Sequence, residues 1–304
     1  MASTDTSARS GASLAGPVLA LCAGAVAMGI SPIFVRFAAA DVGPFASAFW
    51  RVALALPVLY AWLRLEETNG AGGARSSFSR ATVLAGAAFA GDLFFWHLSI
   101  LNTTVANATF FATTAPVFVV LVAWLVLRRR VSRGTVGGLV LCCLGGVALI
   151  GQSLDVAPAR IVGDLYGVAT AVFFALYFLA VERAREGGGA ARVTFELTLV
   201  TTAILLVVAL LLEDRVMPLT REGVAALIAM AWISHAGGQG LLSIALGRLP
   251  AVFSSLVIFL EAVAAAAFGW MILNERLTPI QLLGGALILA GIWLARLRVR
   301  SAPT

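Results

Sequence analysis

The sequence has no lysine and few charged residues of any kind. Charged side chains make up only 12% of its 304 residues, and all 21 basic residues are arginines. Soluble domains usually carry about 25% charged residues. Hydrophobic residues reach 61%, and the mean hydropathy is +0.98. Because so few polar side chains cannot cover so much apolar surface, the composition excludes a water-soluble globular protein.

Cysteine and catalytic motifs are scarce as well. Cys22, Cys142 and Cys143 all lie in apolar runs, which argues against a disulfide framework or a zinc site. The sequence has no HExxH motif, no G-x-S-x-G elbow and no aspartate-rich cluster for a magnesium-bound diphosphate. We therefore expect no catalytic residues, no metal and no cofactor, and we keep an intramembrane enzyme only as a remote alternative.

Long apolar runs recur along the whole chain and approach the roughly 20 residues that a membrane-spanning helix needs. The first run resembles a signal peptide, but it continues through Pro32 to Ala40, so we expect it to be kept as a span. The sequence thus predicts an all-α integral membrane protein with ten transmembrane helices. Charge clusters and Gly/Pro signals place them near 14–38, 44–65, 80–101, 103–127, 134–152, 161–182, 193–212, 222–247, 250–273 and 279–296.

The arginines predict the orientation of these spans. With the N-terminus inside, fifteen arginines flank the cytoplasmic ends and five flank the outer ends, so the positive-inside rule places both termini in the cytoplasm. This rule also accounts for the basic net charge, and we expect no nucleic-acid partner. We predict a multi-pass protein of the inner (plasma) membrane. The five outer arginines are Arg36, Arg160, Arg215, Arg221 and Arg276.

The two halves of the chain resemble each other. The segment "WLVLRRRVSRGTVGGLVLCCLGG" from Trp124 aligns with "WMILNERLTPIQLLGGALILAG" from Trp270 at an offset of 146, and this alignment also pairs glycines. We predict two units, residues 1–152 and 153–304, each with five spans. Because five is odd, the second unit enters the membrane from the opposite side, which makes an inverted repeat around a central cavity. The paired glycines are Gly138 with Gly284 and Gly145 with Gly291.

The segment "PAVFSSLVIFLEAVAAAAFGWMILNERLTPIQLLGGALILAGIWL" resembles the closing helices of the EamA type of the drug/metabolite transporter superfamily. The resemblance implies a secondary transporter that exports small metabolites by alternating access. Within the superfamily the chain resembles YddG-like exporters of aromatic and other neutral amino acids, and a multidrug or lipophilic-cation exporter is the alternative. One departure is that Ala115-Pro116 stands in the first half where the second half has Glu261-Ala262.

Charged side chains inside spans need a reason, because each costs about 2.5–3.5 kcal/mol to insert. Arg51 and Asp92 are expected at similar depth, either as an ion pair between the second and third spans or as substrate-facing groups. His97 lies about 140° around the helix from Asp92, whereas Trp96 shares the face of Asp92. We therefore expect only one of Asp92 and His97 to face a central cavity, with His97 packing near the outer interface.

On the eighth span, helical spacing predicts a single polar and aromatic stripe, made of Trp232, His235, Gln239 and Ser243. On the ninth span, Ser254 and Glu261 share a face. His235 and Glu261 are expected to form a hydrogen bond between these helices. Alternatively, one of them takes up and releases protons during transport. Glycine and proline positions mark the expected flexing points, which are Gly29 with Pro32, Pro116, and Gly237 with Gly238.

Neutral polar and aromatic side chains on other spans complete the predicted cavity, which suits neutral or zwitterionic solutes such as amino acids. The expected partners are this small-molecule substrate and the lipid bilayer, and a role for protons is left open. The predicted substrate-binding residues are Trp50, Arg51, Asp92, Trp96, Asn107, Phe110, Phe174, Tyr177, Trp232, His235, Gln239, Ser254 and Glu261.

Overall fold

The computed structural model describes residues 14–38, 41–69, 78–103, 105–150, 158–273 and 277–299, and in this part of the chain all regular structure is helical. Each of the ten predicted spans contains a helical segment. Among the described residues, nine segments are long and apolar enough to cross a membrane, and a tenth, Arg133–Leu149, is shorter but apolar. The predicted all-α membrane fold is confirmed.

In the first half the helices are α1 (Ala15–Gly29), α2 (Ser31–Ala38), α3 (Pro44–Ala53), α4 (Leu56–Thr68), α5 (Arg80–Asn102), α6 (Val105–Thr113), α7 (Ala115–Leu125) and α8 (Arg133–Ile150). In the second half a 3₁₀ turn, η1 (Pro158–Arg160), precedes α9 (Ile161–Arg185), α10 (Ala190–Leu212), α11 (Arg221–Ala229), a π-helix η2 (Met230–Gln239), α12 (Gly240–Leu246), α13 (Ala251–Val257), α14 (Phe259–Leu273) and α15 (Pro279–Val299). Five of the spans are therefore broken or wound irregularly.

Proline explains three of the interruptions. Pro32, Pro57 and Pro116 stand in the first turns of α2, α4 and α7. Because proline has no N–H to donate, it cannot continue the preceding helix. The first turn of a helix does not use this donor, so proline is accepted at the start of the next helix. The break between α13 and α14 falls at Ile258 and has no proline. Irregular backbone at membrane depth is tolerated where protein or a cavity surrounds it, so these breaks point to the interior of the bundle.

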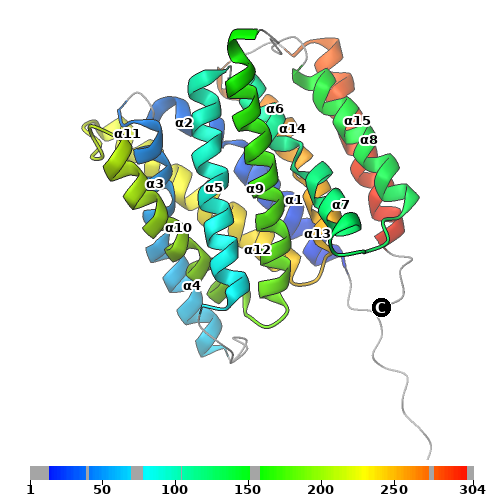
Figure 1. Cartoon of the computed structure of the whole chain (residues 1–304), viewed down its shortest axis with the longest axis horizontal. Coiled ribbons are helices and arrows are strands. Elements are labelled where there is room, and N and C mark those ends of the chain that lie inside the picture. The colour runs from blue at the N-terminus through cyan, green and yellow to red at the C-terminus, as the bar shows by residue number, and fades with distance from the viewer. Residues whose placement is uncertain are drawn as a thin grey trace, which may run out of the picture.

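The two halves of the chain are interleaved. Helix α1 packs against η2, α12 and α14 of the second half, and α9 packs against α5, α6 and α7 of the first half (Figure 1). Helix α10 lies against α3 and α5, while α8 and α15 run side by side. The inverted repeats therefore share one bundle rather than forming two separate lobes.

Helices α8 and α15 touch through the glycines that the sequence alignment pairs. A Cβ built on Gly145 would lie 2.6 Å from the carbonyl oxygen of Gly284, and one on Gly138 would lie 2.5 Å from that of Gly291. Glycine is thus required for this close approach of two backbones. Gly145 meets Gly284, the equivalent of Gly138, and Gly138 meets Gly291, the equivalent of Gly145. An antiparallel two-fold relation between the helices produces this exchange of partners.

The axis of this relation passes near Cys142. Its thiol lies 3.6 Å from the carbonyl oxygen of Ile288, which is its own equivalent at the offset of 146. A residue meets its own equivalent only beside a two-fold axis. The inverted repeat inferred from the sequence is therefore visible in the packing of α8 on α15.

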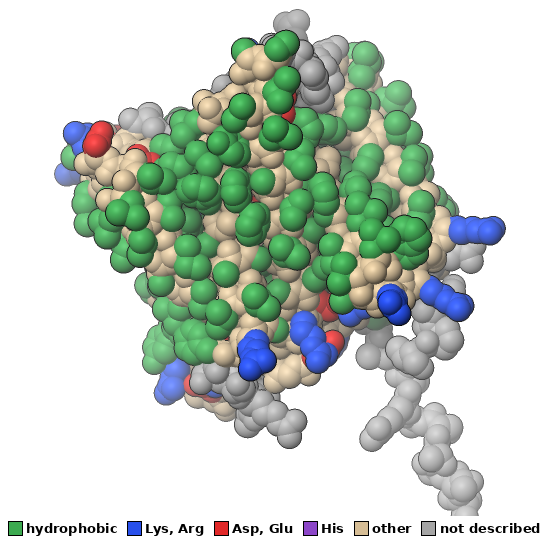
Figure 2. Space-filling view, in the orientation of Figure 1, with side chains coloured by type: hydrophobic (Ala, Val, Ile, Leu, Met, Phe, Trp, Pro, Cys, Tyr) green, Lys and Arg blue, Asp and Glu red, His purple; other side chains and the backbone are tan. Residues whose placement is uncertain are grey.

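Charge is concentrated at the ends of the bundle. Figure 2 shows an apolar belt across the middle of the visible face, with arginines mainly along the lower edge. This lower edge holds the ends of α4 and α9 and the connection between α7 and α8 (Figure 1). Arg160, Arg215 and Arg221, three of the predicted outer arginines, belong to the opposite ends of the helices. The bundle thus carries arginine on the side predicted to face the cytoplasm.

A candidate substrate cavity inside the bundle

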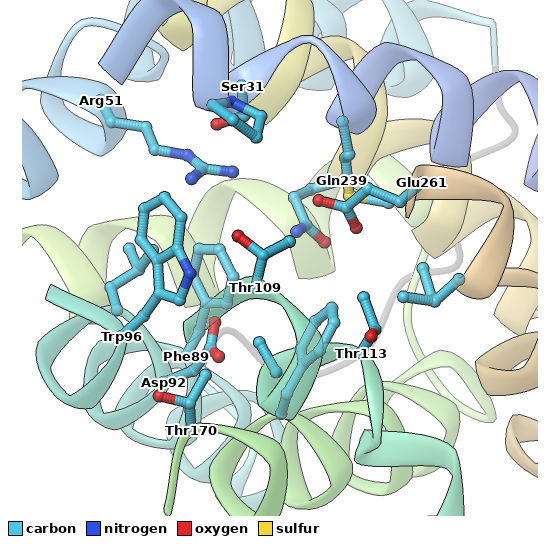
Figure 3. Close-up of a pocket in the computed structure, with 16 residues that line it drawn as sticks. Ser31, Arg51, Phe89, Asp92, Trp96, Thr109, Thr113, Thr170, Gln239 and Glu261 are labelled. Carbon is cyan, nitrogen blue, oxygen red and sulfur yellow. The ribbon is translucent and has the colours of Figure 1, made fainter. Parts of the chain in front are cut away.

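A cavity lies where three broken helices meet in the centre of the bundle. Its wall includes Ser31 beside the α1–α2 break, Thr113 beside the α6–α7 break and Ile258 at the α13–α14 break (Figure 3). Helices α3, α5, α9 and η2 also contribute residues to the wall. The remaining lining residues are Met28, Pro32, Arg51, Phe89, Asp92, Leu93, Trp96, Thr109, Ala112, Thr170, Phe174, Gln239 and Glu261.

The wall brings together six of the predicted substrate-binding residues from five different elements. They are Arg51, Asp92, Trp96, Phe174, Gln239 and Glu261. Asp92 and Trp96 share one face of α5, as their spacing predicted, and His97 does not line the cavity. His97 is 2% exposed, and its Nδ1 lies 2.6 Å from the carbonyl oxygen of Leu93.

Arg51 is the cation of the cavity wall. It is 7% exposed and its guanidinium points into the cavity (Figure 3), with Nη2 donating to Ser234 Oγ at 3.4 Å. The predicted ion pair with Asp92 is not formed, although the structure describes both residues. Nε of Arg51 has no hydrogen-bond partner among the described residues. The guanidinium therefore keeps free donors for an anionic group.

Two carboxylates face the same space. Asp92 on α5 and Glu261 on α14 both line the cavity, and neither carboxylate accepts a hydrogen bond from any described residue. Glu261 sits one turn after the α13–α14 break, where its own N–H donates to the carbonyl oxygen of Ile258 at 2.8 Å. Gly29 lets α1 come close at this point, because a Cβ there would lie 2.7 Å from the carbonyl oxygen of Glu261.

Tyr177 supports the wall from behind. It is fully buried, and its hydroxyl donates to Oε1 of Gln239 at 2.8 Å. The ring of Tyr177 also packs on Phe89 of the wall with centroids 4.9 Å apart. Because the oxygen of the Gln239 amide is occupied, its NH₂ group is the part left to face the cavity.

His235 lies in the layer behind Phe89 and outside the wall. It is fully buried, with Nε2 3.0 Å from Thr198 Oγ1 and its ring centroid 5.4 Å from that of Phe89. The predicted hydrogen bond between His235 and Glu261 is therefore absent, because His235 faces α10 and Glu261 faces the cavity. Nδ1 of His235 has no partner among the described residues.

Trp232 is separated from the polar stripe of which it was predicted to be part. Its side chain is 53% exposed and donates from Nε1 to the carbonyl oxygen of Leu54, whereas His235, Gln239 and Ser243 are buried. The prediction assumed 3.6 residues per turn. The π-helix winds more residues into each turn and rotates Trp232 away from the buried face.

Four other predicted residues lie outside the cavity wall. Trp50 donates from Nε1 to a backbone carbonyl of the α10–α11 connection at 2.7 Å, and Asn107 donates to Asp164 on α9 at 3.0 Å. Phe110 packs edge-on against its neighbour in the chain, and Ser254 is fully buried. A role for these residues in binding stays a prediction.

Several wall residues were missed by the sequence analysis, and spacing would have found some of them. Phe89 lies three residues before Asp92 and so shares its face of α5. Thr109 and Thr113 are four residues apart on α6 and form one hydroxyl-bearing face. Ser31 gave no such signal, because the α1–α2 break decides where its side chain points.

Comparison with known proteins agrees with this architecture. A model of the EamA-like transporter family matches the chain twice, over residues 15–151 and 161–297. An uncharacterized transporter of Archaeoglobus fulgidus is 25% identical over 271 residues, covering 86% of this chain and 91% of that protein. The threonine/homoserine exporter RhtA of Escherichia coli K12 is 31% identical over 209 residues, covering 68% of each chain.

A solved crystal structure superimposes on this structure with a TM-score of 0.81 at 20% identity, covering 95% of this chain and 100% of the other. At that identity the likeness concerns the fold. The family matches together span almost the whole chain and fall on its two halves. With these matches and the inverted repeat in the packing, the chain belongs to the EamA-like transporter family.

Proposed function

We propose that the protein is a secondary transporter that exports neutral amino acids, aromatic ones included, across the inner (plasma) membrane by alternating access. Both termini face the cytoplasm in this proposal, as the arginine distribution predicts. Support for an amino-acid substrate comes from the 31% identity to the exporter of threonine and homoserine.

One observation carries the proposal, namely that the cavity wall combines a cation with two carboxylates. A zwitterionic amino acid presents a carboxylate, which fits the free donors of Arg51. Its ammonium group fits Asp92 or Glu261, whose carboxylates accept no hydrogen bond from the described residues. Each charge of the ligand then meets an opposite charge, which offsets the cost of carrying it into the membrane.

The neutral part of the wall fits the side chains of such substrates. Phe89, Trp96 and Phe174 give apolar and aromatic surface, and the hydroxyls of Thr109 and Thr170 add polar contacts. Aromatic rings pack favourably against aromatic side chains of a ligand, and the hydroxyls suit small polar ones. This mixture supports both aromatic and small neutral amino acids.

We assign the two repeats to residues 1–152 and 153–304, with a boundary in the segment that the structure does not describe. Because the repeats are interleaved, opening to either side requires movement of helices from both. The breaks near Gly29 and Pro32 and at Pro116, and the π-helix that contains Gly237 and Gly238, are the flexing points of this proposal.

The second candidate function is export of lipophilic cations or drugs. Two carboxylates outnumber the single arginine in the wall, and aromatic rings bind cations over their faces. A substrate of that class needs an ammonium or aromatic cation and no carboxylate. Arg51 distinguishes the two candidates, because only an amino acid gives it a partner.

The deciding experiment is counterflow with purified protein in liposomes preloaded with an unlabelled amino-acid mixture. We expect saturable uptake of labelled phenylalanine, threonine or alanine, and a loss of at least ten-fold in Arg51→Gln, since a charge-assisted contact contributes roughly 1.5–3 kcal/mol. Arg64→Gln is the matched control, because Arg64 pairs with Glu67 at the exposed end of α4. Folded protein without counterflow of any amino acid contradicts the proposal, and saturable uptake of a lipophilic cation then supports the second candidate.

Proton exchange is tested in the same liposomes. We propose that Glu261 takes up and releases the proton, because it lies beside a helix break and its carboxyl group has no hydrogen-bond partner among the described residues. A pH gradient should then stimulate uptake by the wild type and leave Glu261→Gln unaffected. Uptake that ignores the gradient in the wild type indicates facilitated diffusion instead.

A further inference from the structure

A groove with an arginine rim lies at the end of the bundle predicted to be cytoplasmic, away from the central cavity. It is lined by Val120 and Trp124 of α7, by Val131 and Val136 on the α8 side, and by three consecutive arginines of the connection. These arginines are Arg128, Arg129 and Arg130. The groove thus has an apolar part on the membrane side and a positive part at its end.

The three arginines have different surroundings. Arg129 forms an ion pair with Glu182 at 2.6 Å, and Glu182 also accepts the N–H of Ala251 at the start of α13. Arg128 and Arg130 are exposed and form no ion pair or hydrogen bond through their side chains with any described residue. Two free guanidinium groups therefore flank an anchored one.

The backbone holds this arrangement in place. Arg128 has a φ of 51°, in the left-handed region that a residue other than glycine seldom adopts. The chain leaves α7 through this residue while the N–H of Arg129 donates to the carbonyl oxygen of Ala123 at 2.8 Å. Tight anchoring of the turn fixes the direction in which the arginines leave the helix.

Trp124 places the groove at the level of the lipid headgroups. Its side chain is 60% exposed, and tryptophan collects at the interface between membrane and water. Figure 2 shows arginine side chains along the lower right edge, near the connection between α7 and α8. In the second repeat, "NER" occupies the place of "RRR" beside Trp270, so the pseudo-symmetric copy lacks the arginine triplet.

We propose that this groove binds an anionic phospholipid of the inner leaflet. The lipid phosphate lies between Arg128 and Arg130, and its acyl chains lie along Val120, Trp124 and Val136. Basic pockets beside transmembrane helices on the cytoplasmic side suit anionic headgroups, and guanidinium groups bind phosphate through paired hydrogen bonds. A free phosphate ion satisfies the arginines but leaves the apolar part of the groove empty, so we commit to the lipid.

Native mass spectrometry of the purified full-length chain tests the proposal without a transport assay. The protein is exposed to equal amounts of phosphatidylglycerol and phosphatidylcholine, and the lipid retained on each protein ion is counted. We expect selective retention of phosphatidylglycerol by the wild type and a drop of roughly 10- to 30-fold in the Arg128→Gln/Arg130→Gln double variant, since each arginine near the surface contributes about ten-fold or less.

The matched control is Arg64→Gln/Arg183→Gln, which removes the same charge from the same end of the bundle but from arginines paired with Glu67 and Glu186. It should retain phosphatidylglycerol like the wild type, and equal thermal unfolding shows that both variants are folded. Equal loss in both double variants, or equal retention of the two lipids by the wild type, overturns the proposal. Displacement of the lipid by millimolar inorganic phosphate overturns the commitment to a lipid.

Discussion

A single buried hydroxyl sets what the cavity offers to a substrate at Gln239. An unrestrained amide can present its oxygen or its nitrogen to a ligand. Here the hydroxyl of Tyr177 occupies the oxygen at 2.8 Å, so Gln239 faces the cavity as a donor. Arg51 and Gln239 thus both present hydrogen-bond donors in the wall, and donors of this kind fit a substrate carboxylate.

Substituting Tyr177→Phe should raise the apparent KM for the proposed amino-acid substrate about five-fold, because losing one hydrogen bond costs roughly 1 kcal/mol and frees the amide to turn. The maximal rate should change less. Counterflow over a range of substrate concentrations measures both. Tyr166→Phe is the control, since Tyr166 lies on the same helix and its ring centroid lies 6.1 Å from that of Phe95. A similar rise in KM for both variants shows that the Tyr177 hydroxyl has no specific effect on Gln239.

Helices α8 and α15 show how small residues decide a contact between elements. Hydrophobic attraction cannot bring helices together in lipid, so close packing of backbones has to do so. Only a residue without a side chain permits the distances found at Gly138, Gly145, Gly284 and Gly291. The contact follows the internal two-fold relation, because equivalent glycines of the two repeats form it.

The substitution Gly145→Ala should destabilise the folded protein by about 1–3 kcal/mol, because the added Cβ meets the backbone oxygen of Gly284, which cannot move without shifting α15. Thermal unfolding of the detergent-solubilised protein should show a lower midpoint. Gly137→Ala on the same helix should leave the midpoint unchanged, since its nearest neighbour would be Leu294 Cδ2 at 3.4 Å. Equal midpoints for the two variants argue against the close approach.

At the scale of the whole molecule, the interleaving of the repeats determines where the cavity lies. Broken helices from both halves meet in the middle of the bundle, so neither half contains a complete wall. Arg51, Asp92 and Trp96 come from the first repeat, while Gln239 and Glu261 come from the second. In the alternating-access cycle that we propose, a substrate held between these residues couples the movements of both repeats.

The orientation of the bundle can be tested with two single cysteines in a variant whose Cys22, Cys142 and Cys143 are replaced by serine. An impermeant maleimide should label Gly187→Cys only in inverted membrane vesicles, and Met217→Cys only in right-side-out vesicles. Gly187 has open space around it at the α9–α10 turn, and Met217 is 63% exposed at the other end. The reverse pattern places the arginine-rich end outside and contradicts the predicted topology.

The sequence alone determined the membrane environment, the ten spans and the inverted repeat. These features depend on local properties, because the length of an apolar run, the positions of prolines and the spacing of glycines do not change with packing. The alignment of Gly138 with Gly284 therefore appeared in the sequence before any contact was known. The shared face of Asp92 and Trp96 followed from regular helix geometry, and α5 is unbroken there.

Only the tertiary structure decided which side chains meet in the cavity. Trp232 faces outward because a π-helix changes the rotation of the eighth span, and the sequence gives no period for such a segment. Arg51 contacts Ser234 rather than Asp92, and His235 contacts Thr198 rather than Glu261. These pairings depend on how each helix is rotated against neighbours from the other repeat, and that rotation is fixed by the packing of the whole bundle.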